Sequence, residues 1–186
     1  MESDLKNITS FVGQSYGPWS VLSIKTIVGK GLSLSSSMDI VKDISVEKSE
    51  NTNWVLKGFT SNLRYTNRPE KIVLDQQPSV LGKPENTFAA FIPIKKNAEW
   101  WLLTQDERRK IMAENSKHIE IGTKYLSAIS RQLFHSRDIG EEFDFLTWFE
   151  FSPNNRERFD ELIFLLRKTE EWKYVEREVD VRLKKK

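Results

Sequence analysis

The chain has 186 residues, of which 38% are hydrophobic and 30% charged, and a net charge of +2. This length and composition are those of an ordinary folded protein, enough for one sizeable domain or two small ones that share a core. Basic and acidic residues are interleaved, so we expect no nucleic-acid partner. No run of about 18 apolar residues occurs, so we expect no membrane span.

The sequence lacks cysteine and has two histidines, His118 and His135. Disulfides, thiolate-bound haem and cysteine zinc sites are therefore excluded. With only two histidines, we expect no multi-histidine metal site within one chain. The N-terminus has no basic region followed by an apolar stretch, so we expect no signal peptide and a cytoplasmic location. A mature exported form that starts at an added Met1 would look the same.

The first half of the chain has few regular patterns. Residues 1–16 are mostly polar and predict a loose lead-in. Apolar positions predict strands at 19–27 and at 54–65. Residues 32–53 follow no pattern that places them, and residues 67–84 carry the turn signals typical of a linker.

From Phe88 onward the patterns become regular. Thr104 and Glu107 form a capping box that opens a helix. The expected elements are a strand at 88–94, a helix from this box to about Leu126, strands at 128–135 and 142–151, a helix after Pro153, and a strand at 174–183. This order is the ferredoxin-like arrangement. The front half then reads as a reduced second unit that completes the sheet, which divides the chain into residues 1–84 and 85–186.

The expected long helix carries a histidine on its apolar face, because Ile111, His118 and Tyr125 recur every seven residues. A histidine in such a place is more often a core or interface residue than a ligand. An inward carboxylate on the other helix, Glu170, could accept the proton of one ring nitrogen and free the other for a metal.

A salt bridge from Glu170 to Arg167 or Lys173 is the simpler interpretation of that carboxylate. Glu171 is a less attractive partner for the histidine, because its helical face is polar.

Strand periodicity places Arg131 on an apolar side with Ile129 and Leu133. Such a cation needs an anionic partner or water, because an unpaired buried charge is costly. The next strand adds an aromatic wall on one side, made of Thr147 and four phenylalanines: Phe143, Phe145, Phe149 and Phe151. One nitrogen ligand, an aromatic cavity and a cation on its wall are what a haem pocket needs.

Lys96, Trp100 and Trp101 come just before the helix. Two adjacent tryptophans cannot both point into one core, so one should face a cavity, a subunit interface or solvent. Lys96 is either an ordinary surface lysine or the partner of an anionic group on a ligand.

Taken together, these motifs resemble the chlorite dismutase family, and in particular its short-chain dimeric branch. The likeness runs from about Phe88 to the C-terminus and more weakly over residues 17–81. The residues that carry it are Lys96, Trp100-Trp101, the segment 103–108, His118 followed thirteen positions on by Arg131, and the segments 143–150 and 166–170.

The resemblance implies haem b with His118 as axial ligand, hydrogen-bonded to Glu170 or, as the alternative, Glu171. Arg131 would be the distal arginine. Further haem contacts are implied for Lys96, Trp100, Trp101, Thr147, Phe149 and Tyr65. With the element order, the resemblance gives an α+β, ferredoxin-like fold with an antiparallel β-barrel. The short front half leaves surface that a second subunit would cover, which favours a homodimer.

The implied reaction turns chlorite into chloride and dioxygen. Ferric haem takes one oxygen atom, leaving a ferryl species and a hypochlorite-level fragment, which recombine to form the O–O bond. Arg131 would hold the small anion during recombination.

Three alternatives remain open. The related coproheme decarboxylases carry glutamine at the distal position and a reactive tyrosine near the propionates, where this chain has Arg131 and Trp100-Trp101. A peroxidase-like haem protein of the same fold is the second alternative. A haem-free ferredoxin-like dimerisation module is the third, with His118 and Glu170 as plain core or interface residues.

Overall fold

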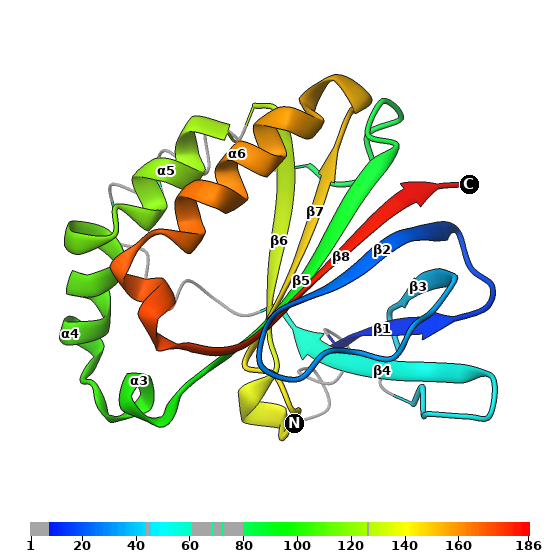
Figure 1. Cartoon of the computed structure of the whole chain (residues 1–186), viewed down its shortest axis with the longest axis horizontal. Coiled ribbons are helices and arrows are strands. Elements are labelled where there is room, and N and C mark those ends of the chain that lie inside the picture. The colour runs from blue at the N-terminus through cyan, green and yellow to red at the C-terminus, as the bar shows by residue number, and fades with distance from the viewer. Residues whose placement is uncertain (1–7, 44, 61–67, 69–71, 73–79, 126) are drawn as a thin grey trace.

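A computed structural model describes residues 8–43, 45–60, 68, 72, 80–125 and 127–186. The strands of these residues close into an antiparallel barrel in the order β1-β3-β2-β8-β5-β7-β6-β4 (Figure 1). Their bounds are β1 (Ile8–Gln14), β2 (Trp19–Val28), β3 (Ser37–Val41), β4 (Thr52–Phe59), β5 (Phe88–Lys96), β6 (Ile129–His135), β7 (Phe145–Phe151) and β8 (Val175–Lys185).

Helices follow β5 and β7 in the chain, and α5 and α6 lie across one side of the sheet (Figure 1). The helical segments are α3 (Ala98–Leu102), α4 (Gln105–Lys110), the π-helical turn η1 (Ile111–Asn115), α5 (His118–Tyr125), the 3-10 turns η2 (Arg137–Ile139) and η3 (Pro153–Asn155), α6 (Arg156–Arg167) and the 3-10 turn η4 (Glu170–Tyr174). None of the described helices has the length and apolar character needed to cross a bilayer.

The α+β, ferredoxin-like fold with an antiparallel barrel is confirmed. The second half lies in the spatial order β8-β5-β7-β6, and the first half repeats this pattern as β4-β1-β3-β2. The connections between β1 and β4 contain no helix in the described residues 8–43 and 45–60. This is what a reduced ferredoxin-like unit would look like, although the boundary between residues 84 and 85 stays a prediction.

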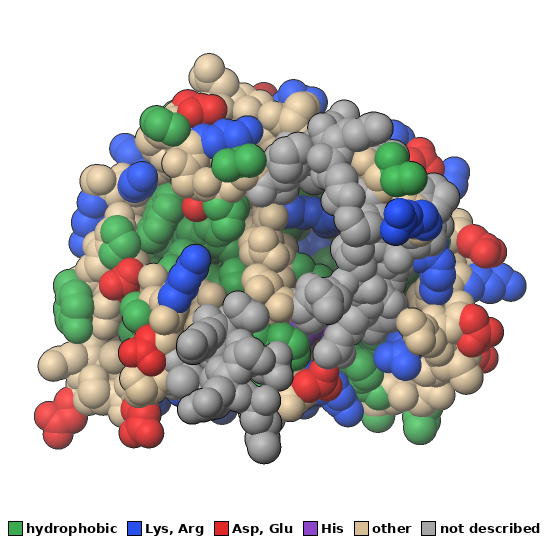
Figure 2. Space-filling model, turned by 180° about the vertical axis from the view of Figure 1, so that it is seen from behind, with side chains coloured by type: hydrophobic (Ala, Val, Ile, Leu, Met, Phe, Trp, Pro, Cys, Tyr) green, Lys and Arg blue, Asp and Glu red, His purple; other side chains and the backbone are tan. Residues whose placement is uncertain are grey.

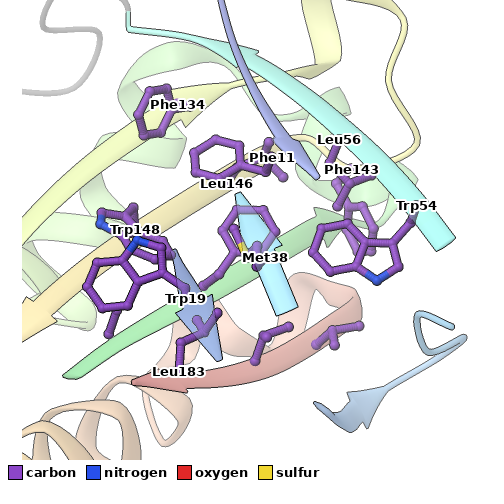
Figure 3. Packing of buried hydrophobic residues seen from close by; sticks show 14 residues of the cluster. Phe11, Trp19, Met38, Trp54, Leu56, Phe134, Phe143, Leu146, Trp148 and Leu183 are labelled. Atoms are coloured by element: carbon purple, nitrogen blue, oxygen red, sulfur yellow. The ribbon is translucent and has the colours of Figure 1, made fainter. Parts of the chain in front are cut away.

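Two hydrophobic clusters lie on opposite faces of the sheet. Inside the barrel, Phe11 stacks on Phe91 with ring centroids 4.5 Å apart, and Trp19 meets Trp148 edge-on (Figure 3). The second cluster packs the outer face of β5 to β7 against α5 and α6. Strand alternation produces this division, because successive side chains of β6 and β7 point to opposite faces. The face in Figure 2 shows a hollow with hydrophobic side chains, and interspersed basic and acidic side chains around it.

The expectation of a loose lead-in at residues 1–16 was wrong for its described part, because residues 8–14 form β1 and are all buried. β1 pairs with β3 and β4 in the barrel wall. One of its buried polar side chains has a clear partner: the hydroxyl of Ser10 donates to the Asp43 carbonyl at 2.6 Å. The unplaced segment 32–53 contains β3.

The expected helix to Leu126 was also wrong, because it is interrupted before His118. The amide of Ser116 donates to the Ile111 carbonyl five residues back, at 2.8 Å, and Lys117 has a φ of 49°. This left-handed residue ends one helix and allows α5 to start in a new direction.

The strand expected at 142–151 starts later, at Phe145. The residues before it are irregular, so Phe143 lies inside the barrel and not on the aromatic wall predicted for it. Phe145, Thr147 and Phe149 do share the opposite side, as predicted.

Candidate functional site

A pocket lies between the outer face of β5 to β7 and the helices, with ≈ 820 Å³ of empty space that is partly open to solvent. Ile92, Ile163 and Leu166 give it an apolar lining. Six of the residues predicted as site residues are in its wall: Lys96, Trp100, His118, Arg131, Thr147 and Phe149. Tyr65, another contact expected around haem, lies outside the described residues.

His118 is the first residue of α5 and makes a short hydrogen bond to a buried carboxylate. Its Nδ1 lies 2.6 Å from Oε2 of Glu171. The other oxygen, Oε1, accepts from Nζ of Lys96 at 2.8 Å, and Lys96 also donates to the Glu171 carbonyl at 3.2 Å. Lys96 and Glu171 are only 3% and 5% exposed, so this chain of contacts is shielded from water.

Glu171 therefore replaces Glu170, which was the first choice for the partner of His118. Helix α6 ends at Arg167, and a 3-10 turn follows from Glu170. The helical spacing that placed Glu170 inward does not continue through this turn, which buries Glu171 instead.

The charge of Glu171 is stabilised by its neighbours. Burial alone would raise the pKa of its carboxyl, but electrostatic attraction from His118 and Lys96, and the hydrogen bonds to both, outweigh this effect and hold the pKa well below its usual range. Glu171 is therefore an anion at neutral pH.

Arg131 enters the same pocket from β6. It stands in register with Phe149 of β7, and Leu133 stands in register with Thr147. The guanidinium reaches α5, since a Cβ added to Gly122 would lie 3.4 Å from Nη1 of Arg131. Burial lowers the pKa of Arg131, but an arginine starts from so high a value that it remains a cation.

The adjacent tryptophans separate as predicted, with only one in the pocket wall. Trp100 is 1% exposed, and its indole N–H has no hydrogen-bond partner among the described residues. Nζ of Lys96 lies 4.7 Å from its ring centroid. Trp101 is outside the wall: it donates to Oδ2 of Asp144 at 3.3 Å and lies 4.1 Å from the guanidinium of Arg137.

Two residues at the site were missed in the sequence. Trp172 lies nearly parallel to His118, with ring centroids 6.4 Å apart and an interplanar angle of 21°. Ser116 accepts the amide proton of Glu171 at 2.9 Å. Trp172 could have been found as the aromatic neighbour of Glu171 in the chain, whereas nothing in the pattern around Ser116 distinguishes it.

Comparison with known proteins identifies the family. A family model described as chlorite dismutase matches residues 41–184. The chain belongs to the chlorite dismutase family. A chlorite dismutase of Ideonella dechloratans is 34% identical over 121 residues, which are 64% of this chain and 40% of that protein. The aligned part thus spans well under half the length of that curated relative.

Solved members of this family have the same fold. A dimeric chlorite dismutase from Nitrobacter winogradskyi is 49% identical with a TM-score of 0.89, over 96% of this chain and 99% of that one. A chlorite dismutase from Candidatus Nitrospira defluvii in complex with imidazole is 19% identical with a TM-score of 0.68, over 98% and 94%. At 19% identity, this second likeness concerns the fold alone.

Proposed function

We propose that this protein is a haem b-dependent chlorite dismutase, which converts chlorite into chloride and dioxygen. Membership of the family and fold supports an enzyme that acts on chlorite. The observation that carries the proposal furthest is one pocket that holds both His118, paired with Glu171, and Arg131.

The residues present fit haem. Since Nδ1 of His118 is engaged by Glu171, the other ring nitrogen, Nε2, is free of that bond and available to iron. The pocket is lined largely by apolar and aromatic side chains, which suit a flat macrocycle. The orphaned indole N–H of Trp100 is a buried donor that a propionate would satisfy.

His118 would be the axial ligand in this arrangement. Lys96 and Trp100 would lie near the proximal side and the propionates, with Trp101 behind them, and Thr147 and Phe149 would line the distal side. Tyr65 is kept as a proposed propionate contact. When bound, haem supplies the iron centre at which an oxygen atom is taken from chlorite and the O–O bond is made.

The anionic Glu171 has a definite task. Its carboxylate holds the proton of His118 at Nδ1, which fixes the tautomer and makes Nε2 a stronger donor. Lys96 balances the negative charge, because a lone buried carboxylate would be too costly.

The task of Arg131 is to attract and keep a small anion. A cation in a shielded pocket interacts with chlorite more strongly than one in water. Arg131 would keep the anion in the pocket during the reaction, while Thr147 and Phe149 would limit the escape of this anion and the entry of water.

The pocket wall favours a dismutase over a coproheme decarboxylase. Its described part contains Arg131, and it has Trp100 in the region where a decarboxylase is expected to have its reactive tyrosine. The decarboxylases are expected to have the reverse, a tyrosine near the propionates and no distal arginine.

We also propose that the protein is a homodimer in the cytoplasm. The dimer is supported by the 49% identical relative, whose structure is described as dimeric, and the location rests on the sequence alone. A molecular mass in solution near twice 21.8 kDa is the expected result.

Oxygen release tests the proposed activity. The haem-loaded protein is mixed with chlorite in an oxygen electrode, beside haem-free protein and free haem at the same concentration. We expect rapid oxygen evolution, with chloride as the other product, from the loaded protein alone. A rate no higher than that of free haem would reject the activity.

A further inference from the structure

We propose that Ser116 is a positioning residue for the haem ligand, because its hydroxyl fixes the backbone of Glu171 and thereby aims the Glu171 carboxylate at His118. This inference rests on the proposed haem ligation by His118. It assigns a role to a residue that lies outside the lining of the pocket.

The contact involves a backbone amide in the first turn of η4. The first amides of a helical turn have no partner within the turn and need an acceptor from elsewhere. Thr169, at the N-cap of η4, does not supply it: its side chain makes no capping hydrogen bond and instead donates to the Leu166 carbonyl at 2.7 Å. The amide of Glu171 donates instead to Oγ of Ser116, 2.9 Å away and 55 positions earlier in the chain.

This bond closes a ring of contacts around the ligand. Ser116 is two residues before His118, and Glu171 is attached to this short segment twice. Its amide donates to Ser116, and its carboxylate bonds to Nδ1 of His118 at 2.6 Å. Two anchors restrict the direction of the carboxylate relative to the imidazole much more than either would alone.

The helix interruption makes this geometry possible. Ser116 lies at the end of η1, where its amide bonds back to the Ile111 carbonyl, and Lys117 then takes a left-handed conformation. His118 therefore starts a separate helix instead of continuing the one that carries Ser116. Both Ser116 and Glu171 are buried, at 4% and 5% exposed, so water does not replace a lost partner easily.

The consequence concerns the iron. A carboxylate held at hydrogen-bond distance increases the electron donation of an imidazole ligand. Ser116→Ala would leave the Glu171 amide buried without its acceptor, and the carboxylate would lose one of its anchors. The ligand would become a weaker donor, which favours ferrous over ferric iron.

The test compares the reduction potential and the rate of haem loss of haem-loaded variants. In Ser116→Ala we expect a more positive potential and haem loss about 10-fold faster, the low end of the effect of removing a second-layer partner. Ser116→Thr keeps the hydroxyl and should stay near the wild type. Ser116→Cys, with a weaker acceptor of similar size, should fall between them and replaces Ser116→Ala if that variant does not fold.

Ser10→Ala is the matched control. Ser10 is also a buried serine, and its hydroxyl donates to the Asp43 carbonyl at 2.6 Å, in β1 and away from the pocket. Its loss should lower stability without moving the potential.

Two failures would be distinguishable. A wild-type protein that binds no haem would overturn the proposed function, and this inference with it. A wild type that binds haem, with an unchanged potential and haem-loss rate in Ser116→Ala and Ser116→Cys, would overturn the role of Ser116 alone. An equal shift in Ser10→Ala would also overturn it.

Discussion

Glu171 bonds to two polar groups that would otherwise lack a partner away from water, the imidazole of His118 and the ammonium of Lys96. Glu171→Gln removes the charge but keeps the size. It leaves Lys96 buried without a counter-charge, and breaking a buried pair in this way costs about 3 kcal/mol or more. We expect a loss of this size in the free energy of urea unfolding of the haem-free protein.

Glu170→Gln is the matched control for this experiment. Glu170 is the neighbouring residue and is less buried, so its change should stay within about 0.5 kcal/mol. Equal losses of unfolding free energy in the two variants would show that the pairing of Glu171 with Lys96 and His118 does not stabilise the protein.

The choice between these two glutamates marks a limit of the sequence analysis. The pattern predicted a carboxylate at the right place in the chain, because helix periodicity describes α6 well. It selected Glu170 because that periodicity was extended past Arg167, where the helix ends. A helix end followed by a 3-10 turn changes which side chain points inward, and Thr169, a residue type common at the start of a helical turn, is the only sign of it between residues 167 and 170.

The role of Arg131 is tested by Arg131→Ala. Haem should still bind, since His118 is unchanged, while the rate of oxygen release should fall about 100-fold, as when one fixed charge-stabilising group is removed. The variant should also bleach after fewer turnovers, because the oxidising fragment is no longer held. Arg131→Lys should keep part of the activity, and a rate and lifetime equal to the wild type in Arg131→Ala would refute this role.

At the scale of elements, ion pairs join α6 to β8. Arg167 bonds to Glu178 at 2.6 Å and to Asp180 at 2.9 Å, and Arg182 bonds to both Asp180 and Asp160. Burial alone would raise the pKa of Asp180, but Arg182 and Arg167 outweigh it and bring the pKa below its ordinary value of 3.8. These contacts hold a covering helix of the pocket on the barrel.

The lowered pKa gives a prediction with a definite sign. When folding lowers the pKa of a carboxyl, the charged carboxylate stabilises the folded protein at any pH above the pKa of the unfolded chain. This stability is lost as the pH falls through the lower pKa of the folded protein. Asp180→Asn should therefore cost about 1–3 kcal/mol at neutral pH. In urea unfolding, this difference from the wild type should shrink below the ordinary value of 3.8. A difference that is constant with pH would contradict this account.

The break between η1 and α5 could not be predicted from the residues that form it. Ser116 and Lys117 are not strong helix breakers, and the apolar spacing from Ile111 to Tyr125 continues across them. Tertiary contacts decide the outcome, because Ser116 bonds to Glu171 of a distant turn. The same long-range contact, which local sequence patterns do not encode, also helps to order the site.

At the scale of the whole molecule, all four strands of the second half of the barrel were predictable, whereas in the first half only β2 and, with different bounds, β4 were predicted. Strands β5 to β8 have regular apolar patterns, and so do the helices between them. β1 carries Thr9, Ser10 and Gln14, yet all are buried because the strand lies in the closed wall between β3 and β4. Polarity normally predicts exposure, and a strand enclosed on both sides breaks that rule.

Haem binding by histidine variants is the most direct test of the account. Haem is titrated into the wild type, His118→Ala and His135→Ala, and the Soret absorption band is followed. His135 is buried at the end of β6 and packs against Phe145, so its replacement matches the loss of a buried imidazole without touching the proposed ligand. We predict a band that saturates at about one haem per chain in the wild type and His135→Ala, and no such band in His118→Ala. An unchanged band in His118→Ala, or none in the wild type, would contradict the account.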